Sequence, residues 1–326
     1  MNSTSFQAPS PPFSSQSPIS DPSDGGSIVI FRGTVDGTSK TLRPSVLVSR
    51  KSSDKGVVLQ RTQTGLIRTF GINMAANFWT SSHYKHLLDQ EDVDMVNPLD
   101  KEKGITLEDF KLIKMHMANY ILKLAQQVKV RQRVVATAIT YMRRVYTRKS
   151  MTEYDPRLVA PTCLYLASKA EESTVQARLL VFYIKKLYTD DKYRYEIKDI
   201  LEMEMKILEA LNYYLVVYHP YRSLSPLLQD AGLNDLNMTQ LTWGFVNDTY
   251  KMDLILVHPP HLIALACIYI ASVLREKDTT AWFEELRVDM NVVKNISMEI
   301  LDFYESNRMF TDERINSALQ KLSLRP

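Results

Sequence analysis

From Thr106 onward, apolar side chains recur every three or four residues, which is the period of an amphipathic helix. Thr106 and Asp109 have the spacing of a capping box at the start of the first such segment. One face of that segment carries Phe110, Ile113, Met117, Tyr120, Ile121 and Leu124. A second helical segment is predicted at 134–146, and its basic residues cluster at the two ends, where we expect them to be mostly solvated: Arg131, Arg133, Arg143 and Arg144.

A third segment is apolar on nearly every side. It opens with Asp155 as N-cap and Pro156 at the first helical position, the favoured order for a helix start. Pro161 removes one backbone hydrogen bond, so the helix either kinks there or begins later. Since a helix that is apolar all round must be surrounded by others, we expect it to be the centre of a bundle. Further helices are predicted at 176–188 and 196–211, and the YHPYRS stretch is interpreted as a linker.

The third segment occurs twice. Residues 156–172 align without gaps on residues 260–276, with Pro, Leu, Ala, Cys, Tyr and Ser matching at an offset of 104 positions. The offset continues upstream, where Ile139 corresponds to Trp243 and Tyr146 to Tyr250. Such self-similarity indicates a duplicated structural unit. The predicted fold is all-α, with two tandem five-helix units.

The segment before the first helix differs in composition. Residues 1–27 are dominated by Ser, Pro and Asp and lack apolar residues to offset the entropy of ordering. Short alternating apolar pieces within 28–73 suggest either weak strands or disorder, and disorder is preferred. We therefore predict a disordered tail over 1–73, a short helix and linker over 74–104, the two units over 105–215 and 216–310, and a C-terminal tail over 311–326.

Charge and motif content narrow the function classes. The formal net charge is +3, but residues 1–73 hold eight Lys or Arg against four Asp or Glu, which leaves 32 against 33 for the rest. A near-neutral folded part provides no bulk attraction for phosphate backbones, so no direct nucleic-acid partner is expected. The longest apolar stretch is shorter than the roughly 20 residues of a bilayer span, so no membrane association is expected. The two cysteines are far apart in the sequence, and it contains no nucleotide-binding or metalloprotease motif. We therefore expect no cofactor, no metal site and no catalytic residues.

The segment LASKAEE at 166–172 ends the third helix, and it is accompanied by ANFWTSSHYKHLLD at 76–89, VYHPYR at 217–222 and WGFVNDTY at 243–250. With these segments the sequence resembles the cyclin family, and within it the Mediator-associated transcriptional C-type cyclins, in a plant-like variant with an extra N-terminal tail. The resemblance implies two cyclin boxes. It also implies a nuclear, regulatory and non-catalytic subunit that binds and activates a cyclin-dependent kinase and joins other subunits of the Mediator kinase module.

The resemblance also assigns kinase-binding residues. It implies that Lys169 and Glu204 bind the kinase backbone near its regulatory αC helix, and that Glu171 and Glu172 lie near the activation segment. Phe78, Trp79 and Tyr84 match a mobile N-terminal helix that adds kinase contacts. The alternatives are solvated surface for the charged residues and packing against the protein's own box for the aromatic ones.

A second partner surface is implied on the second box. Trp243, Asn247 and Asp248 share a helix face and, with Tyr304, resemble a groove that receives an activating subunit of the Mediator kinase module. A core role for Trp243 is the alternative, because its repeat equivalent is Ile139. The alternative function is a general transcription factor of the B type, whose cyclin-like repeats bind DNA and a TATA-binding protein.

Overall fold

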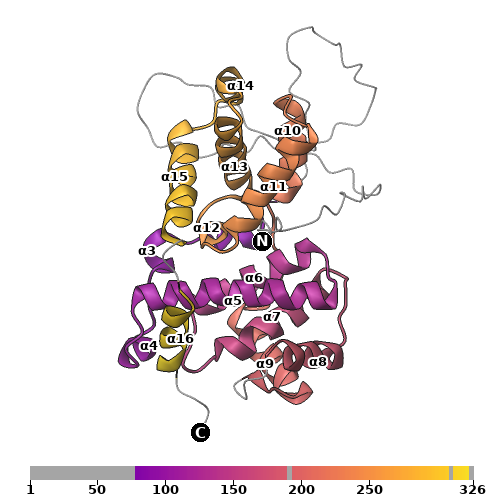
Figure 1. The fold of residues 1–326 in the computed structure, drawn as a ribbon, viewed down its shortest axis with the longest axis vertical. Helices are drawn as coiled ribbons and strands as arrows, with labels where there is room; N and C mark the ends of the chain where they lie inside the picture. Colours follow the sequence, from indigo (N-terminus) through magenta and orange to yellow (C-terminus); the bar gives the residue numbers. More distant parts are fainter. Residues whose placement is uncertain (1–77, 189–192, 308–310, 323–326) are drawn as a thin grey trace, which may run out of the picture.

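The computed structural model describes residues 78–188, 193–307 and 311–322. The tail predicted over 1–73 lies outside the described residues. Within those ranges every regular element is a helix, which confirms the all-α prediction. Two helical units lie one above the other along the long axis, with the magenta helices below and the orange ones above, and the last yellow helix returns to the lower unit (Figure 1).

The first unit contains five helices, four of which pack around α7. The five are α5 (Leu107–Val128), α6 (Gln132–Tyr146), α7 (Pro156–Ala170), α8 (Ala177–Leu187) and α9 (Ile197–Ala210). The α7 helix contacts the other four, and only a few of its residues are solvent-accessible. The capping box of Thr106 and Asp109 is present at the start of α5, as predicted.

Pro161 lies inside α7 and does not delay its start. The helix begins at Pro156, with the Asp155 carboxylate accepting a hydrogen bond from the backbone N–H of Arg157 at 2.9 Å. Of the two expectations for Pro161, a later helix start is therefore wrong. Pro161 has no N–H to donate to the Arg157 carbonyl, and the surrounding helices hold the segment helical in spite of that loss.

The second unit repeats this plan around α13. Its helices are α10 (Tyr221–Asp230), α11 (Leu236–Thr249), α13 (Pro260–Leu274), α14 (Thr280–Leu286) and α15 (Met290–Asn307), with the single turn α12 (Leu254–Val257) between α11 and α13. The α13 helix contacts α10, α11, α12 and α15, and its Tyr269 ring meets Phe283 of α14 edge to face. The predicted linker YHPYRS is partly helical, since α10 begins at Tyr221.

The repeat extends to the backbone that ends each central helix. Glu172 and Glu276, which are equivalent at the offset of 104, both adopt left-handed conformations, with φ of 53° and 51°. The next residue donates its N–H to the Ser168 carbonyl at 2.8 Å in one copy and to the Ser272 carbonyl at 2.9 Å in the other. This is the Schellman arrangement, and it places the acidic ends of α7 and α13 in matching geometry.

The first part of the N-terminal segment is attached to the second unit, whereas Asp100 accepts hydrogen bonds from Ser150, Met151 and Thr152 of the first. The segment contains α2 (Ser82–Lys85), α3 (Gln90–Val93) and α4 (Pro98–Glu102). The buried His83 ring accepts a hydrogen bond from the backbone N–H of Tyr218 at 3.0 Å and bonds the Ile255 carbonyl at 3.3 Å. Leu88 donates its N–H to the Leu256 carbonyl at 2.9 Å. The α2 helix is therefore fixed to α12 and to the linker between the units.

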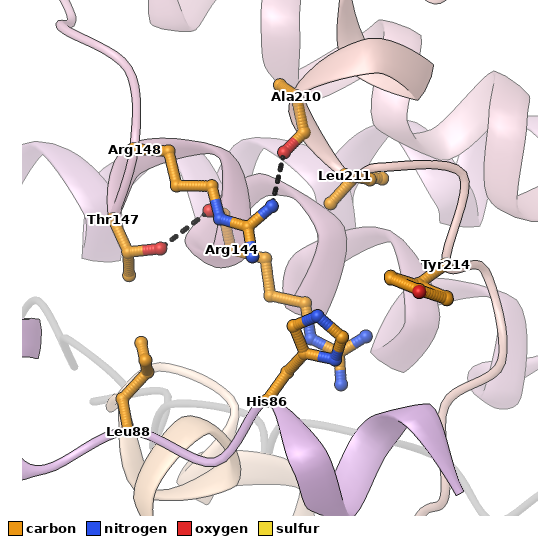
Figure 2. A pocket seen from close by; sticks show the side chains of 8 residues that line it. All are labelled: His86, Leu88, Arg144, Thr147, Arg148, Ala210, Leu211 and Tyr214. Atoms are coloured by element: carbon orange, nitrogen blue, oxygen red, sulfur yellow. Dashed lines mark hydrogen bonds between the residues drawn. The ribbon is translucent and has the colours of Figure 1, made fainter.

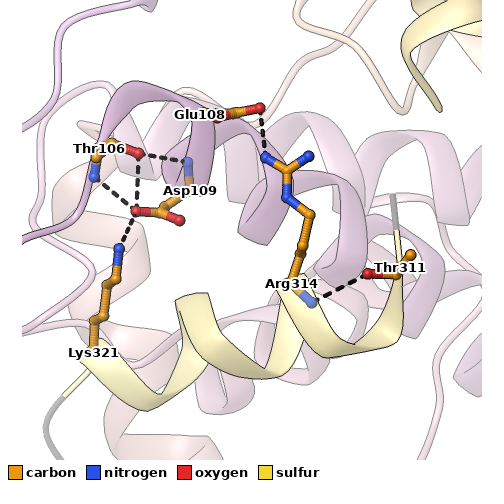
Figure 3. A network of polar contacts seen from close by, with 6 residues as sticks. All are labelled: Thr106, Glu108, Asp109, Thr311, Arg314 and Lys321. Atoms are coloured by element: carbon orange, nitrogen blue, oxygen red, sulfur yellow. Dashed lines mark hydrogen bonds and ion pairs between the residues drawn. The ribbon is translucent and has the colours of Figure 1, made fainter. Parts of the chain in front are cut away.

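The last helix, α16 (Asp312–Lys321), lies within the segment that was predicted to be a C-terminal tail. It returns to the first unit and packs on α5, to which it contributes the buried Ala318. Figure 3 shows the polar contacts that flank this packing: Arg314 pairs with Glu108 and Lys321 with Asp109, each at 2.6 Å. Because Asp109 also caps α5, one carboxylate links both helices.

A buried ionic triad joins the two units. Asp253, which precedes α12, accepts hydrogen bonds from Lys114 of α5 at 2.8 Å and Arg143 of α6 at 2.6 Å. Arg143 also donates to the Tyr250 carbonyl at 3.0 Å. The expectation of a solvated Arg143 is wrong, because the side chain is only 1% exposed, whereas Arg131 and Arg133 are exposed. Burial alone would raise the pKa of Asp253, but Arg143 and Lys114 outweigh it and lower the pKa to about 2.

Candidate functional site

Lys169 and Glu204, which the sequence analysis assigns to one patch, form an ion pair in the structure. Lys169 is in the last turn of α7 and Glu204 in the middle of α9, and these helices pack together. The Lys169 ammonium also lies over the Tyr165 ring, 4.7 Å from its centroid, one turn earlier on α7. The Lys169 side chain is 40% exposed and that of Glu204 only 7%, so the buried carboxylate holds an accessible ammonium in place.

Exposed apolar residues also occur on α9 and in the segment after it. Leu201 and Met205 flank Glu204 on the helix, and Tyr213, Tyr214 and Val216 follow its end. All five are large and at least 43% exposed. Large apolar side chains grouped at the surface of a folded domain are typical of a protein-binding surface. We call Lys169, Glu204 and these five residues the α9 surface.

Glu171 and Glu172, at the end of α7, have different surroundings. Glu171 is the C-cap; its Oε1 accepts a hydrogen bond from Thr137 at 2.7 Å and its Oε2 pairs with Arg133 at 2.6 Å. Its side chain is 10% exposed, so most of its hydrogen-bonding capacity is used within the chain. Glu172 is exposed and takes part in the left-handed cap.

A chain of hydrogen bonds connects Glu171 to the second unit. The Thr137 hydroxyl has one hydrogen, which it donates to Glu171, so His219 Nε2, 2.8 Å away, must donate to the Thr137 oxygen. His219 Nδ1 is then the acceptor for the Tyr250 hydroxyl at 2.6 Å. Burial lowers the pKa of His219 to about 3, which agrees with this neutral tautomer. The bonds run in one direction, from Tyr250 to the Glu171 carboxylate.

The N-terminal aromatic residues pack against their own chain. Phe78 is buried, with its ring edge to face against Tyr218 at 5.4 Å and against His83 at 5.6 Å. Trp79 and Tyr84 are half-buried and meet each other at 4.8 Å, and Trp79 also contacts His261. The alternative of self-packing therefore describes Phe78, while Trp79 and Tyr84 keep accessible surface.

The four residues of the second predicted surface lie on α11 and α15, where each contacts a tyrosine or is one. Trp243 stacks on Tyr221 at 4.8 Å, and Asn247 accepts a hydrogen bond from the Tyr221 hydroxyl at 2.7 Å. Asp248 accepts one from Tyr304 of α15, also at 2.7 Å. Trp243, Asn247 and Asp248 are half-buried, so Trp243 is neither fully core nor free surface.

The sequence analysis missed the residues that connect the two units. Thr137, His219, Lys114 and Asp253 come from distant parts of the chain, and no local spacing brings them together. One signal was present, because Lys114 follows Phe110 by four residues and therefore lies on the apolar face of α5. A cation at such a position needs a buried partner.

Two kinds of site are missing from the part of the chain that the structure describes. Its His, Cys, Asp and Glu side chains form no group of three or more that could hold a metal ion. None of its helices combines the length and the apolar character needed to cross a membrane.

Comparisons with known proteins identify the family. The model of the cyclin N-terminal domain matches residues 82–216. Cyclin-C1-2 of Arabidopsis thaliana is 73% identical over 253 residues, which are 78% of this chain and 100% of that protein. Cyclin-C of Rattus norvegicus is 41% identical over 74% of this chain and 87% of its own length. A chain in the structure of the CAK complex of Chaetomium thermophilum shares the fold, with a TM-score of 0.60 at 16% identity over 77% of this chain and 89% of that one.

These relatives are cyclins over most or all of their length, so the alternative of a general transcription factor of the B type is set aside. The two packed units are the two predicted cyclin boxes. The chain therefore belongs to the cyclin family, in its C-type branch, and is a regulatory subunit of a cyclin-dependent kinase rather than an enzyme.

Proposed function

We propose that the α9 surface is where this cyclin binds its kinase, with Lys169 and Glu204 at its centre. The observation that carries the proposal is an accessible ammonium held by a buried carboxylate among exposed apolar side chains. Apolar contacts supply affinity, and a charged donor at a fixed position selects the backbone carbonyl groups that it can reach. Lys169 has three N–H donors, and the ion pair with Glu204 leaves the others for a partner.

In this proposal the cyclin activates the kinase because binding at the α9 surface stabilises the active position of the kinase αC helix. A kinase whose αC helix is held inward keeps its Lys–Glu ion pair and its metal site assembled. A cyclin that binds only this state shifts the kinase population towards it by its difference in affinity for the two states. Glu172, exposed at the end of α7, is placed on the same helix end as Lys169 and contributes to this contact. Trp79 and Tyr84 add contacts from the N-terminal segment.

The test compares charge reversals on two ion pairs of the same cyclin. Lys169→Glu is expected to weaken binding to a co-expressed cyclin-dependent kinase at least tenfold, measured by biolayer interferometry. The matched control is Lys111→Glu on α5, because Lys111 also pairs with an acid, Asp94, and its side chain is 46% exposed, close to the 40% of Lys169. Circular dichroism establishes that each variant is folded. Equal kinase affinity of the folded Lys169→Glu variant and the control would place the kinase elsewhere.

We further propose that the cyclin acts in the nucleus, in the Mediator kinase module, and that the α11 surface (Trp243, Asn247, Asp248 and Tyr304) binds another subunit of that module. Gly244 lies beside Trp243 on α11, and a Cβ added there would meet nothing within 4 Å, so a partner can approach the helix backbone closely. Asp248→Asn is expected to reduce recovery of the module on affinity-purified cyclin while kinase recovery is kept. Unchanged recovery of every module subunit would contradict this assignment, and fluorescence microscopy of the tagged cyclin tests the nuclear location.

A further inference from the structure

Arg144, near the end of α6, has two guanidinium nitrogens without a hydrogen-bonding partner. Its Nε and Nη2 atoms are buried, and neither forms a hydrogen bond. Its neighbour Arg143 is buried as a whole and is neutralised by Asp253, whereas Arg144 is half-buried. Burial lowers the pKa of Arg144 to about 10, so the side chain is still charged at neutral pH. A buried charge that is not paired is costly, and such groups call for an explanation.

The guanidinium borders a pocket at the junction of the N-terminal segment and the first box. Figure 2 shows Arg144 reaching toward His86 and Tyr214, with Arg148 beside it donating to the Ala210 carbonyl at 3.1 Å. The pocket is a small cavity of about 30 Å³ that opens to solvent. Its walls are completed by Leu88, Thr147, Ala210 and Leu211.

The lining is cationic and contains no acid. Arg144 and Arg148 face this space, and no Asp or Glu lines it. The ends of α6 and α9 meet here, and the partial negative charge of a helix C-terminus offsets part of the arginine charge. That compensation leaves the Nε and Nη2 atoms of Arg144 without an acceptor.

We propose that this pocket binds an anionic group, a carboxylate or a phosphate, that is carried on a side chain of a partner protein. A guanidinium binds both groups through paired N–H donors, and these bonds are strong where water is excluded. The apolar walls of Leu88, Leu211 and the Tyr214 ring can contact the aliphatic part of a side chain, which favours an attached group over a free ion. Tyr214 also belongs to the α9 surface, so a protein bound there can reach the pocket, but the site does not depend on the kinase assignment.

The experiment uses blocked amino acids as probes, because they carry only the side-chain anion. Acetyl-phosphoserine amide and acetyl-aspartate amide are titrated into the full-length protein at constant ionic strength, with acetyl-serine amide as the neutral reference, and the unfolding temperature is recorded. We expect a saturable rise with at least one anionic probe. A rise with phosphoserine alone identifies a phosphorylated side chain as the ligand, and a rise with aspartate as well identifies an acidic side chain.

Variants separate this site from general charge effects. Arg144→Gln is expected to weaken the apparent affinity at least tenfold, and Arg131→Gln, which changes an exposed arginine at the other end of α6, is expected to leave it unchanged. If Arg144→Gln does not fold, Arg148→Gln tests the same pocket from its exposed side and is expected to weaken binding several-fold. No response to either anionic probe, or the same response in the pocket variants and wild type, overturns the proposal.

Discussion

Removing the Asp253 carboxylate tests the ionic triad that joins the two boxes. In Asp253→Asn, Lys114 and Arg143 keep their charges but lose the anion between them. Their side chains are 2% and 1% exposed, so water cannot replace it. Breaking a buried ion pair by removing one partner destabilises a protein by about 3–5 kcal/mol. We expect the free energy of unfolding to fall by that amount.

Urea unfolding followed by circular dichroism measures this change, and Asp94→Asn is the matched control. Asp94 also pairs with a lysine of α5, Lys111, at 2.7 Å, but these side chains are 25% and 46% exposed. An exposed pair contributes about 0–1 kcal/mol. If the two variants lose the same free energy, within about 1 kcal/mol, burial does not set the strength of the Asp253 contacts and the reasoning is wrong.

The double variant Lys114→Met with Asp253→Asn separates charge from packing. It removes one of the two cations that Asp253→Asn leaves unpaired, so we expect it to be more stable than Asp253→Asn alone.

The contribution of Asp253 to stability depends on pH with a defined sign. The folded-state pKa of Asp253 is about 2, below its ordinary value of 3.8, so its stabilisation is present above pH 3.8 and is lost as the pH falls through about 2.

Three further predictions concern stability. The folded-state pKa of His219 is about 3 and its ordinary value is 6.5, so between these values the unfolded chain binds a proton that the folded chain does not. Lowering the pH from 6.5 to 5 should therefore reduce the free energy of unfolding by about 2 kcal/mol through this residue. In His219→Gln, urea midpoints across this range should depend less on pH. Gly244→Ala should raise the free energy of unfolding by about 0.5–1 kcal/mol, since the added methyl meets no neighbour and alanine favours the helix, and a lower melting temperature would contradict this. Lys321→Met should lower the free energy of unfolding by less than about 1 kcal/mol, because its pair with Asp109 is partly exposed. Ala318→Glu places a charge at a buried position and should detach α16 from α5, which faster proteolysis of the C-terminus would detect.

Sequence reasoning succeeded where the information is local or periodic. The Thr106–Asp109 capping box, the start of α7 at Pro156 and the equivalence of α7 and α13 follow from spacing over a few residues or from one constant offset. Helical period and capping depend on neighbours within one or two turns, so the sequence determines them directly.

Pro161 and Arg143 show the limit of that reasoning. Local propensity opposes a proline inside a helix, yet α7 is continuous because neighbouring helices enclose it on all sides. Arg143 ends a helix in a basic pair and was expected in water, but Asp253, distant in sequence, makes its burial possible. Burial of a charge depends on the partner that the fold supplies.

By itself, the sequence determined the all-α class, the duplicated unit and the segment that carries Lys169, because these depend on residue type and spacing. Only the tertiary structure decided that Glu204 is a buried anchor for Lys169, that Tyr250, His219, Thr137 and Glu171 form one directed chain, and that Arg144 lacks a partner. Each of these depends on which atoms from distant segments come within hydrogen-bonding distance and on how much water remains between them. That information belongs to the packed helices rather than to any stretch of sequence.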